Sequence, residues 1–250
     1  MLMVNCPRLK NKQPLPWFRK QIEIKDNILN WHPISLLNVD AKIASKALSK
    51  RLEKVLPDTI HRKQHAYVKG HSISVVVRNI YDIVDYTKNE KLPGLLVALD
   101  FEKAFDLLSW NFLLRTLESF NFRSSFNNWV KTQQQCMQLH NEQWLHVEFI
   151  KQGMRQGDPL SAYLFIIALE VLLIHIQNDS SVSGIKIGSD MIKLCAFADL
   201  ICLLKDKPSY TNFQQTVHRF SLCPGLKLNK EKTKILWLGS KRMILTFFCT

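Results

Sequence analysis

The chain has 250 residues, a length that fits one large domain or two small ones with a sizeable core. Hydrophobic residues make up 46% of the sequence and charged residues 22%, which excludes a disordered tail or a coiled coil as the bulk of the chain. Lysine and arginine number 34 against 21 acidic residues, a formal net charge of +13, so nucleic acid is the expected partner, although a merely basic globular protein has the same balance.

The cysteines and the apolar segments argue against secretion and against a membrane span. The six cysteines show no Cys-x-x-Cys spacing, so we expect reduced thiols, several of them buried, rather than a zinc site or a disulfide framework. The N-terminus lacks the apolar stretch of a signal peptide. The most apolar run, residues 163–176, contains Glu170 and is shorter than the roughly 20 residues of a membrane helix. We expect a soluble intracellular protein, in the cytoplasm and nucleus, with a buried helix at this run.

The N-terminal third of the chain predicts two helices after an irregular lead-in at residues 1–30. From residue 39 to residue 56, apolar side chains recur at steps of three and four residues, which predicts an amphipathic helix. Its other face is basic and carries Lys42, Lys46, Lys50, Arg51 and Lys54. That face is either a solvated surface or a contact for a phosphate backbone. A second helix is predicted from residue 71 or 72 to about residue 88.

The rest of the chain mixes strands and helices. A short apolar run that ends at Asp100 predicts a buried strand at 95–99. Further helices are predicted near 110–120, 126–135 and 160–176, a hairpin within 137–150, a turn at 153–158, and extended segments at 185–187 and 193–205 around a tight turn at Ala198 and Asp199. Because the order shows no regular alternation of strand and helix, we predict an α+β fold, a mainly antiparallel sheet backed by helices.

Two aspartates in apolar surroundings are the first candidates for chemistry. Asp100 ends a predicted strand, and Asp199 lies within the apolar segment 195–204, where a carboxylate is costly unless a cation or a hydrogen-bond donor compensates it. Because Asp100 is at a strand end and Asp199 is in a hairpin turn, the two carboxylates can meet on adjacent strands and hold Mg²⁺. Taken singly, each can equally serve as a turn residue or a strand terminator.

Six short motifs then follow one another along the chain. LDFEKAFD at 99–106 has the form D-x-x-K-A-F-D, GMRQGDPLS at 153–161 is similar to G-x-R-Q-G-x-P-L-S, and GLKLNKEKT at 225–233 is similar to G-L-x-x-N-x-x-K-[ST]. AFADL at 196–200 lies where F/Y-A-D-D is expected, while NWHPISLLN at 30–38 and QHAYVKGHS at 64–72 are similar to N-Y-R-P-I-S-L-L-N and Q-x-G-F-x-x-G-R-S. The ordered set covers roughly residues 30–239 and resembles the reverse transcriptase domain of non-LTR (LINE-type) retrotransposons.

This resemblance implies a polymerase-type palm with fingers and without a thumb. The implied divisions are a lead-in at 1–30, a reverse transcriptase domain at 31–240 and a tail at 241–250. Within the domain, the fingers span about 31–92 and the palm about 93–240. The implied activity is RNA-directed DNA polymerisation by two-metal catalysis with Mg²⁺ or Mn²⁺, on an RNA template with a DNA primer and dNTP substrates. No membrane partner is implied, and the oligomeric state is left open. The alternatives are a catalytically inactive nucleic-acid-binding remnant and a translated remnant without a stable fold.

The resemblance also implies roles for individual residues. Asp100, Asp199 and the carbonyl of Phe101 are the implied metal ligands. Lys232 would protonate the departing pyrophosphate, although a lysine at such a position is otherwise a solvated surface residue. The implied substrate-binding residues are Phe105, as a steric gate against a 2′-hydroxyl, together with Lys69, Arg155, Gln156, Gly157 and Phe197.

The chain departs from the family pattern at several positions. Leu200 stands where the second aspartate of F/Y-A-D-D is expected, and a leucine cannot bind metal, so we expect impaired activity from this copy. The same leucine is expected to suit an apolar hairpin. His32 and His71 replace arginines, which should weaken triphosphate binding because a neutral ring lacks the permanent charge and fork geometry of a guanidinium. Lys69 is a candidate substitute.

Overall fold

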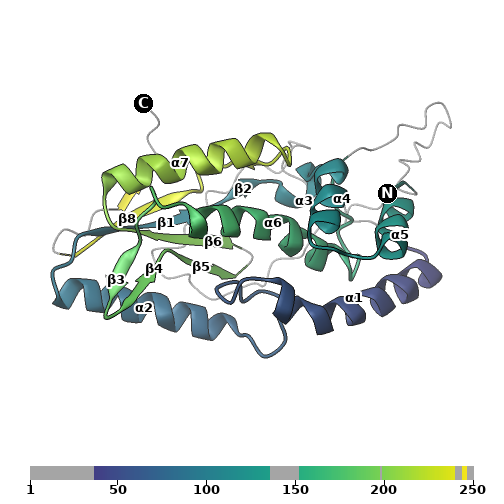
Figure 1. The fold of residues 1–250 in the computed structure, drawn as a ribbon, viewed down its shortest axis with the longest axis horizontal. Coiled ribbons are helices and arrows are strands. Elements are labelled where there is room, and N and C mark those ends of the chain that lie inside the picture. The colour runs from purple at the N-terminus through teal and green to yellow at the C-terminus, as the bar shows by residue number, and fades with distance from the viewer. Residues whose placement is uncertain (1–36, 136–151, 198, 240–243, 247–250) are drawn as a thin grey trace, which may run out of the picture.

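The computed structural model describes residues 37–135, 152–197, 199–239 and 244–246 (Figure 1). The elements follow in the order α1 (Val39–Thr59), α2 (Ile73–Asn89), β1 (Gly94–Leu99), β2 (Phe101–Glu102), α3 (Ala104–Leu107), α4 (Trp110–Ser119), α5 (Ser124–Gln135), α6 (Ser161–Asn178), β3 (Ile185–Ile187), β4 (Asp190–Ile192), β5 (Leu194–Phe197), β6 (Asp199–Leu204), α7 (Lys207–Leu222), β7 (Lys227–Leu228), β8 (Lys234–Leu238) and β9 (Ile244–Thr246). The predicted α+β fold is confirmed.

An antiparallel sheet forms the centre of the fold, with the strand order β5-β6-β1-β8-β9. β1 lies inside this sheet, so that Val97 pairs with Cys202 of β6 on one side and with Ile235 of β8 on the other. Two smaller two-stranded sheets accompany it, β2 with β7 and β3 with β4. A strand paired on both sides leaves few backbone groups unsatisfied, which suits a segment as apolar as β1.

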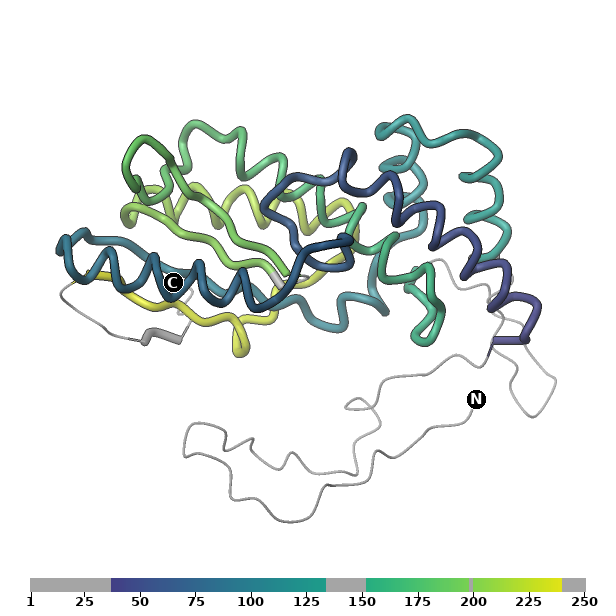
Figure 2. Tube along the Cα trace, turned by 90° about the horizontal axis from the view of Figure 1, so that it is seen from below, coloured from purple at the N-terminus to yellow at the C-terminus, as the bar shows by residue number. Residues whose placement is uncertain are grey.

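Helices cover both faces of the central sheet. Alternate residues of β1 point to opposite faces, so Val97 and Leu99 join the larger hydrophobic core with α6 and α7, whereas Leu96 packs in a second cluster with Val76 and Ile83 of α2. Figures 1 and 2 show α2 at the end of the molecule where β3 and β4 lie, and α1 at the other end, toward α4 and α5. The sheet is therefore the middle layer between α2 and the α6–α7 pair.

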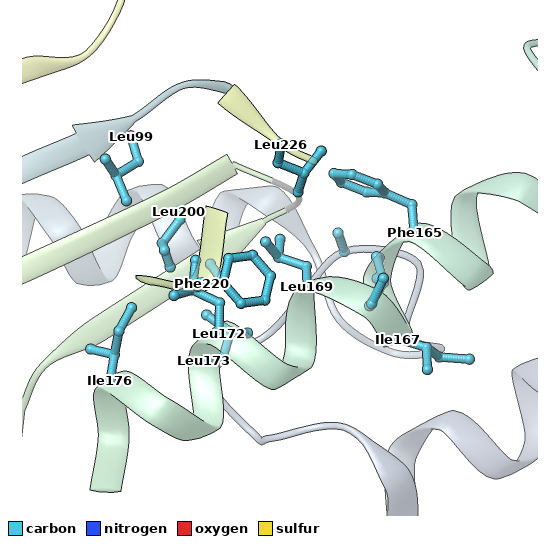
Figure 3. Close-up of a cluster of buried hydrophobic side chains, with 14 of the residues drawn as sticks. Leu99, Phe165, Ile167, Leu169, Leu172, Leu173, Ile176, Leu200, Phe220 and Leu226 are labelled. Atoms are coloured by element: carbon cyan, nitrogen blue, oxygen red, sulfur yellow. The ribbon is translucent and has the colours of Figure 1, made fainter. Parts of the chain in front are cut away.

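The core is built around α6, which is apolar on nearly all sides. Eleven of its residues are buried, and Figure 3 shows Leu169, Leu172 and Leu173 of this helix close to Leu200 and Phe220. By length and composition alone α6 is the one described helix that could cross a membrane, but its buried side chains pack against the sheet and α7. The interpretation of residues 163–176 as a buried helix is confirmed.

Most predicted elements are confirmed. The sequence pattern located α1, α2, β1, α4, α5 and α6 to within a few residues, and the predicted extended segments at 185–187 and 193–205 form β3, β5 and β6, whereas β4 was not predicted. The expected hairpin at 137–150 and the lead-in at 1–30 lie outside the described residues. Of the cysteines in the described part, Cys195 and Cys202 are free and buried, as expected, while Cys223 is free and exposed.

Helix α7 was not predicted, although its beginning carries a recognisable signal. Asp206 is the N-cap, and its carboxylate accepts a hydrogen bond from the backbone N–H of Ser209 at 2.9 Å. Pro208 occupies the first turn, where its missing N–H costs nothing. An acidic cap followed by proline is therefore the feature that would have located this helix.

Glu170 is a carboxyl group inside the core. Its side chain on α6 is 1% exposed, Oε1 accepts a hydrogen bond from the backbone N–H of His61 at 2.8 Å, and Oε2 has no hydrogen-bond partner among the described residues. Burial raises the pKa of Glu170 from 4.5 to about 7, although the His61 hydrogen bond acts in the opposite direction. The folded chain therefore holds a proton that the unfolded chain releases.

This pKa predicts that Glu170 makes stability depend on pH. Between pH 4.5 and about 7 the unfolded chain ionises Glu170 while the folded chain keeps it protonated, so this group lowers stability as pH rises through that window and keeps it low above it. The substitution Glu170→Gln keeps a side-chain oxygen that can accept the hydrogen bond from the N–H of His61, and it removes the ionisable carboxyl group. We expect the variant to be more stable than the native chain at pH 8, by on the order of 2 kcal/mol in urea unfolding.

The same comparison at pH 4 is the internal control, because at that pH Glu170 is mostly protonated in both the folded and the unfolded native chain, and the pH-dependent part of the stability difference should largely vanish. A stability difference between the variant and the native chain that is constant from pH 4 to pH 8 would show that the pKa of Glu170 is not raised in the folded chain.

Candidate active site

Two adjoining clefts contain most of the residues implied by the motifs. The larger, called here the Asp100 cleft, has a volume of about 830 Å³ and is lined by residues 100–107 and 227–232 and by Gln156. The smaller, called here the Tyr67 cleft, has a volume of about 420 Å³ and is lined by Tyr67, Phe105, residues 155–158, Ser161 and Ala162. Phe105 and Gln156 line both clefts and form their shared wall.

The walls of the Asp100 cleft come from two motifs that are far apart in the sequence. Directly after β1, the backbone carbonyl of Asp100 accepts a hydrogen bond from the N–H of Asn229 at 2.8 Å, and the N–H of Asp100 donates to Oγ1 of Thr233 at 3.3 Å. Phe101 of β2 pairs with Leu228 of β7. These contacts place Asp100 and Lys232 in the walls of the same cleft.

Lys232 is the last residue of the turn that leads to β8. Its backbone N–H donates to Oδ1 of Asn229 at 3.1 Å, and its side chain is exposed where it lines the cleft. The ammonium group is therefore tethered through its backbone while its side chain stays in contact with solvent, which suits a donor that meets a soluble reactant.

Sheet register brings Asp100 beside the backbone of residue 199. Leu99 of β1 pairs with Leu200 of β6, so the next residues along these antiparallel strands are Asp100 and Asp199, and Asp199 pairs across the hairpin with Phe197. The predicted meeting on adjacent strands therefore holds at the level of the backbone. The side chain of Asp199 lies outside what the structure describes.

The oxygen donors at this point suit a hard divalent cation. Asp100 is half-buried at the cleft wall and Phe101 follows it, which offers a carboxylate and a carbonyl of the kind that Mg²⁺ prefers. Within the part of the chain that the structure describes, no group of three or more histidine, cysteine, aspartate or glutamate side chains could hold a metal ion. A metal at Asp100 would therefore need Asp199 and substrate oxygens to complete its coordination.

Leu200 belongs to the core and not to the cleft. Its side chain is 1% exposed and lies in the larger hydrophobic core, and Figure 3 shows it close to Leu99 and Phe220. Because side chains alternate along β6, that of residue 200 lies on the face of the sheet that α6 and α7 cover. The expectation that an apolar residue suits this hairpin is confirmed.

The loop at 152–158 is fastened to the segment that follows β2 by backbone hydrogen bonds. The N–H of Gly153 donates to the carbonyl of Leu108 at 2.8 Å, and the N–H of Met154 donates to the carbonyl of Phe105 at 2.5 Å. Nε1 of Trp110 donates to the carbonyl of Gly153 at 2.6 Å. These bonds, together with the bridge between Ser109 and Gln152, are called here the loop clamp.

Glycine is required where the loop clamp is tightest. Gly153 has φ +93°, a conformation that other residues rarely adopt, and a Cβ there would lie 2.9 Å from the carbonyl oxygen of Asp106. The glycine of the G-x-R-Q-G motif thus lets two backbone segments come into direct contact.

The shared wall of the two clefts is held by side chains as well. Phe105 stacks on Phe165 of α6 with ring centroids 4.8 Å apart, and Nε2 of Gln156 donates to Oδ1 of Asp106 at 3.3 Å. Arg155, 7% exposed, donates from its guanidinium to the backbone carbonyl of Gln133 in α5. Arg155 therefore lines the Tyr67 cleft and at the same time ties the loop to α5.

Sequence reasoning missed Asp106 and Asp158. Oδ1 of Asp158 accepts hydrogen bonds from the hydroxyl of Ser45 on α1 and from the N–H of Leu160, the latter at 2.9 Å, so Asp158 joins α1 to the loop. Asp106 is the last residue of the D-x-x-K-A-F-D pattern. Its place in that pattern was the available signal, whereas the partners of Asp158 are visible only in the fold.

Three of the predicted substrate-binding residues lie in different surroundings. Gly157 lines the Tyr67 cleft with φ +99°. Lys69 is exposed and is not among the residues that line the two clefts, and Phe197 packs against both hydrophobic clusters at the end of β5. Roles for Lys69 and Phe197 stay predictions.

His71 lies at another cavity, which also contains His61 and His65. The rings of His65 and His71 are 4.7 Å apart, and burial, followed by the charges of His71 and Lys63, lowers the pKa of His65. A neutral His65 lets the two rings lie this close at neutral pH. His32 lies outside the described residues.

Comparison with known proteins shows which family this chain matches. Residues 23–243 match the family model described as reverse transcriptase (RNA-dependent DNA polymerase). The chain is 30% identical over 220 residues to the transposon TX1 uncharacterized 149 kDa protein of Xenopus laevis, a match covering 86% of this chain and 17% of that protein. It is 27% identical over 236 residues to a retrovirus-related Pol polyprotein from type-1 retrotransposable element R2 of Popillia japonica, covering 90% of this chain and 33% of that protein.

Solved structures share the fold at lower identity. Apo telomerase from Candida tropicalis truncated from its C-terminal domain superposes with a TM-score of 0.55 at 16% identity, covering 80% of this chain and 42% of that one. Telomerase from Candida albicans in complex with the TWJ fragment of telomeric RNA gives a TM-score of 0.55 at 15% identity, covering 78% of this chain and 34% of that one. The chain thus spans less than half the length of these relatives.

The burial of Leu200 predicts that restoring a carboxylate there destabilises this chain. Leu200→Asp places an ionisable group without a hydrogen-bond partner in an apolar core, so we expect a loss of roughly 3 kcal/mol or more in urea unfolding at pH 7.5, and a smaller loss at pH 5 where the new carboxyl is protonated. Leu200→Met keeps the volume and is the matched control, with an expected loss below about 1.5 kcal/mol. Equal stability of Leu200→Asp and the native chain at pH 7.5 would show that residue 200 is not in the core.

Proposed function

We propose, from the premise that this chain belongs to the reverse transcriptase (RNA-dependent DNA polymerase) family, that its two adjoining clefts carry out template-directed nucleotidyl transfer. Its relatives are transposon and retrotransposable-element proteins, and the chain is a reverse transcriptase domain of the non-LTR type. The observation that carries the proposal is the shared wall, where Phe105 and Gln156 from distant motifs separate Asp100 from the Tyr67 cleft.

The metal would be held at the strand ends of β1 and β6. Asp100, Asp199 and the carbonyl of Phe101 would bind Mg²⁺ or Mn²⁺, which when bound lowers the pKa of the attacking primer hydroxyl and stabilises negative charge on the transferred phosphate. Asp100 is fixed for this purpose by its backbone bonds to Asn229 and Thr233. A carboxylate held by its backbone loses little entropy when it binds a cation.

The remaining residues of the clefts would bind the incoming nucleotide and protonate the pyrophosphate that leaves it. Phe105, braced by Phe165, would lie under the sugar and exclude a 2′-hydroxyl. Gln156 and Gly157 would contact the incoming nucleotide from the loop, and Lys232, which lines the Asp100 cleft, would donate a proton to the departing pyrophosphate.

RNA is the proposed template and a DNA strand the proposed primer. One structural neighbour is a telomerase complex with an RNA fragment, and the basic face of α1 suits a nucleic-acid backbone in this chain. The lysines at positions 42, 46, 50 and 54 recur every four residues on that helix and are all exposed. Such a stripe neutralises phosphates in any sequence, which a template-reading enzyme requires.

The burial of Leu200 favours a second candidate function, a nucleic-acid-binding domain without turnover. Loss of one carboxylate weakens a two-metal site while the basic surface and the core persist. This alternative predicts salt-sensitive RNA binding and no extension of a primer, so the two functions separate in one assay.

The proposed polymerase predicts primer extension that depends on Asp100. With poly(rA)/oligo(dT), dTTP and Mg²⁺ or Mn²⁺, we expect slow extension by this chain and a loss of at least roughly 100-fold in Asp100→Ala, because the variant removes a ligand of the metal. Asp190→Ala is the matched control, since Asp190 is an exposed carboxylate of the β3–β4 hairpin and should be neutral. Extension that survives Asp100→Ala would rule out this site, and RNA binding without extension would favour the second function.

The basic stripe predicts the salt dependence of RNA binding. Replacing Lys42, Lys46 and Lys54 together by glutamine should reduce the slope of log affinity against log salt for single-stranded RNA by about 2, because each lost phosphate contact removes about 0.7. Lys50 is kept because it lies 3.3 Å from Glu53.

The matched control for the stripe replaces Lys186, Lys205 and Lys207, exposed lysines near the β3 end of the molecule, by glutamine. This variant has the same net charge as the first. An equal fall in slope in both variants, measured by fluorescence anisotropy, would show that α1 is not the RNA-contacting surface.

A further inference from the structure

Asp106 is an acidic side chain in the wall of the Asp100 cleft to which neither the motifs nor the proposed reaction give a role. Its Oδ1 accepts a hydrogen bond from Nε2 of Gln156 at 3.3 Å. Gln156 lines both clefts, so this bond lies in their shared wall. We infer that Asp106 is a positioning residue, which holds the Gln156 amide in the orientation that the incoming nucleotide meets. The inference rests on the proposed function.

The backbone on the Asp106 side of this bond is fixed. The N–H of Asp106 donates to the carbonyl of Lys103 at 2.7 Å in the short helix α3, and Lys103 enters that helix in a left-handed conformation with φ 41°. The carbonyl oxygen of Asp106 faces Gly153 at a distance that would admit no Cβ. Asp106 therefore has little freedom to follow Gln156 if the glutamine turns away.

The backbone on the Gln156 side is fixed as well. The loop clamp binds Gly153 and Met154 to the carbonyls of Leu108 and Phe105, and Arg155 is anchored to α5. With both backbones held, the conformational entropy lost in forming the Gln156–Asp106 bond is confined to side-chain torsions. Removal of the Asp106 carboxylate should accordingly free the amide of Gln156 without displacing the loop.

A carboxylate also decides which end of the amide faces it. Ionised aspartate only accepts hydrogen bonds, so Gln156 must present its NH₂ group to Asp106, which leaves Oε1 as the acceptor for a substrate donor. A sugar hydroxyl of a nucleotide is a donor of this kind. Without Asp106, either end of the Gln156 amide can turn toward the substrate. One of the two orientations places the NH₂ donor where an acceptor is needed.

A double-mutant cycle in the full chain tests the inference. We expect Asp106→Ala to raise the KM for dTTP about 2- to 10-fold in primer extension, the effect of one hydrogen bond, with a smaller change in kcat. In a Gln156→Ala background the same substitution should have no further effect on the KM, because Asp106 acts through Gln156. Asp106→Asn retains an acceptor but can also donate to Oε1 of Gln156, so its KM should lie between those of the native chain and Asp106→Ala.

The matched control is Glu118→Ala, which removes the same charge from an exposed position on α4 and should leave the KM unchanged. A KM effect of Asp106→Ala that is equally large in the Gln156→Ala background would overturn the inference, because Asp106 would then act independently of the glutamine.

A second measurement does not need turnover. In the ¹⁵N spectrum, the side-chain NH₂ signal of Gln156, identified by its absence in Gln156→Ala, should shift in Asp106→Ala and stay in place in Glu118→Ala. An unmoved signal would overturn the inference even in an active enzyme. A shifted signal in a chain that extends no primer would support the positioning of Gln156 by Asp106 and contradict the proposed function instead.

Discussion

The antiparallel pairing of β1 with two neighbours is the constraint on which the rest of this structure depends. Because β1 bonds to β6 on one side and to β8 on the other, its last residue is followed by a point where three distant parts of the sequence meet. Leu99 opposite Leu200 brings Asp100 beside residue 199, and Ala98 opposite Lys234 brings the turn before β8 across Asp100. The candidate metal ligands are thus placed by sheet register, while the side chains inside the sheet supply the stability.

A second layer of organisation comes from polar contacts between loops. The loop clamp joins residues 152–154 to residues 105–110, Asp158 joins that loop to α1, and Arg155 joins it to α5. Each contact is local and worth about 1 kcal/mol, but together they fix one loop to three separate elements. A wall built in this way keeps its shape without a ligand, which lowers the entropy lost when a substrate binds.

The elements that sequence predicted well are those whose pattern is local. The hydrophobic periodicity predicts helix α1, and the apolar run after Pro93 and Gly94 predicts strand β1. The motifs located Asp100, Phe105 and Gln156 in the cleft. What sequence could not supply are contacts across long stretches of chain. The bond between Asp106 and Gln156 and the burial of Glu170 against His61 depend on which segments the fold brings together. Helix α7 is the intermediate case, since its N-cap signal was local but its apolar pattern was weak.

The position of Leu200 also bears on how such a chain can change over generations. A side chain in a core limits which residues can replace it, and the neighbours of Leu200 include Leu99 and Phe220 (Figure 3). A change of Leu200 to aspartate would place an ionisable group among these side chains, so the loss of stability expected from that change acts against it. The core therefore constrains residue 200 through packing, whether or not a side chain at this position takes part in metal binding.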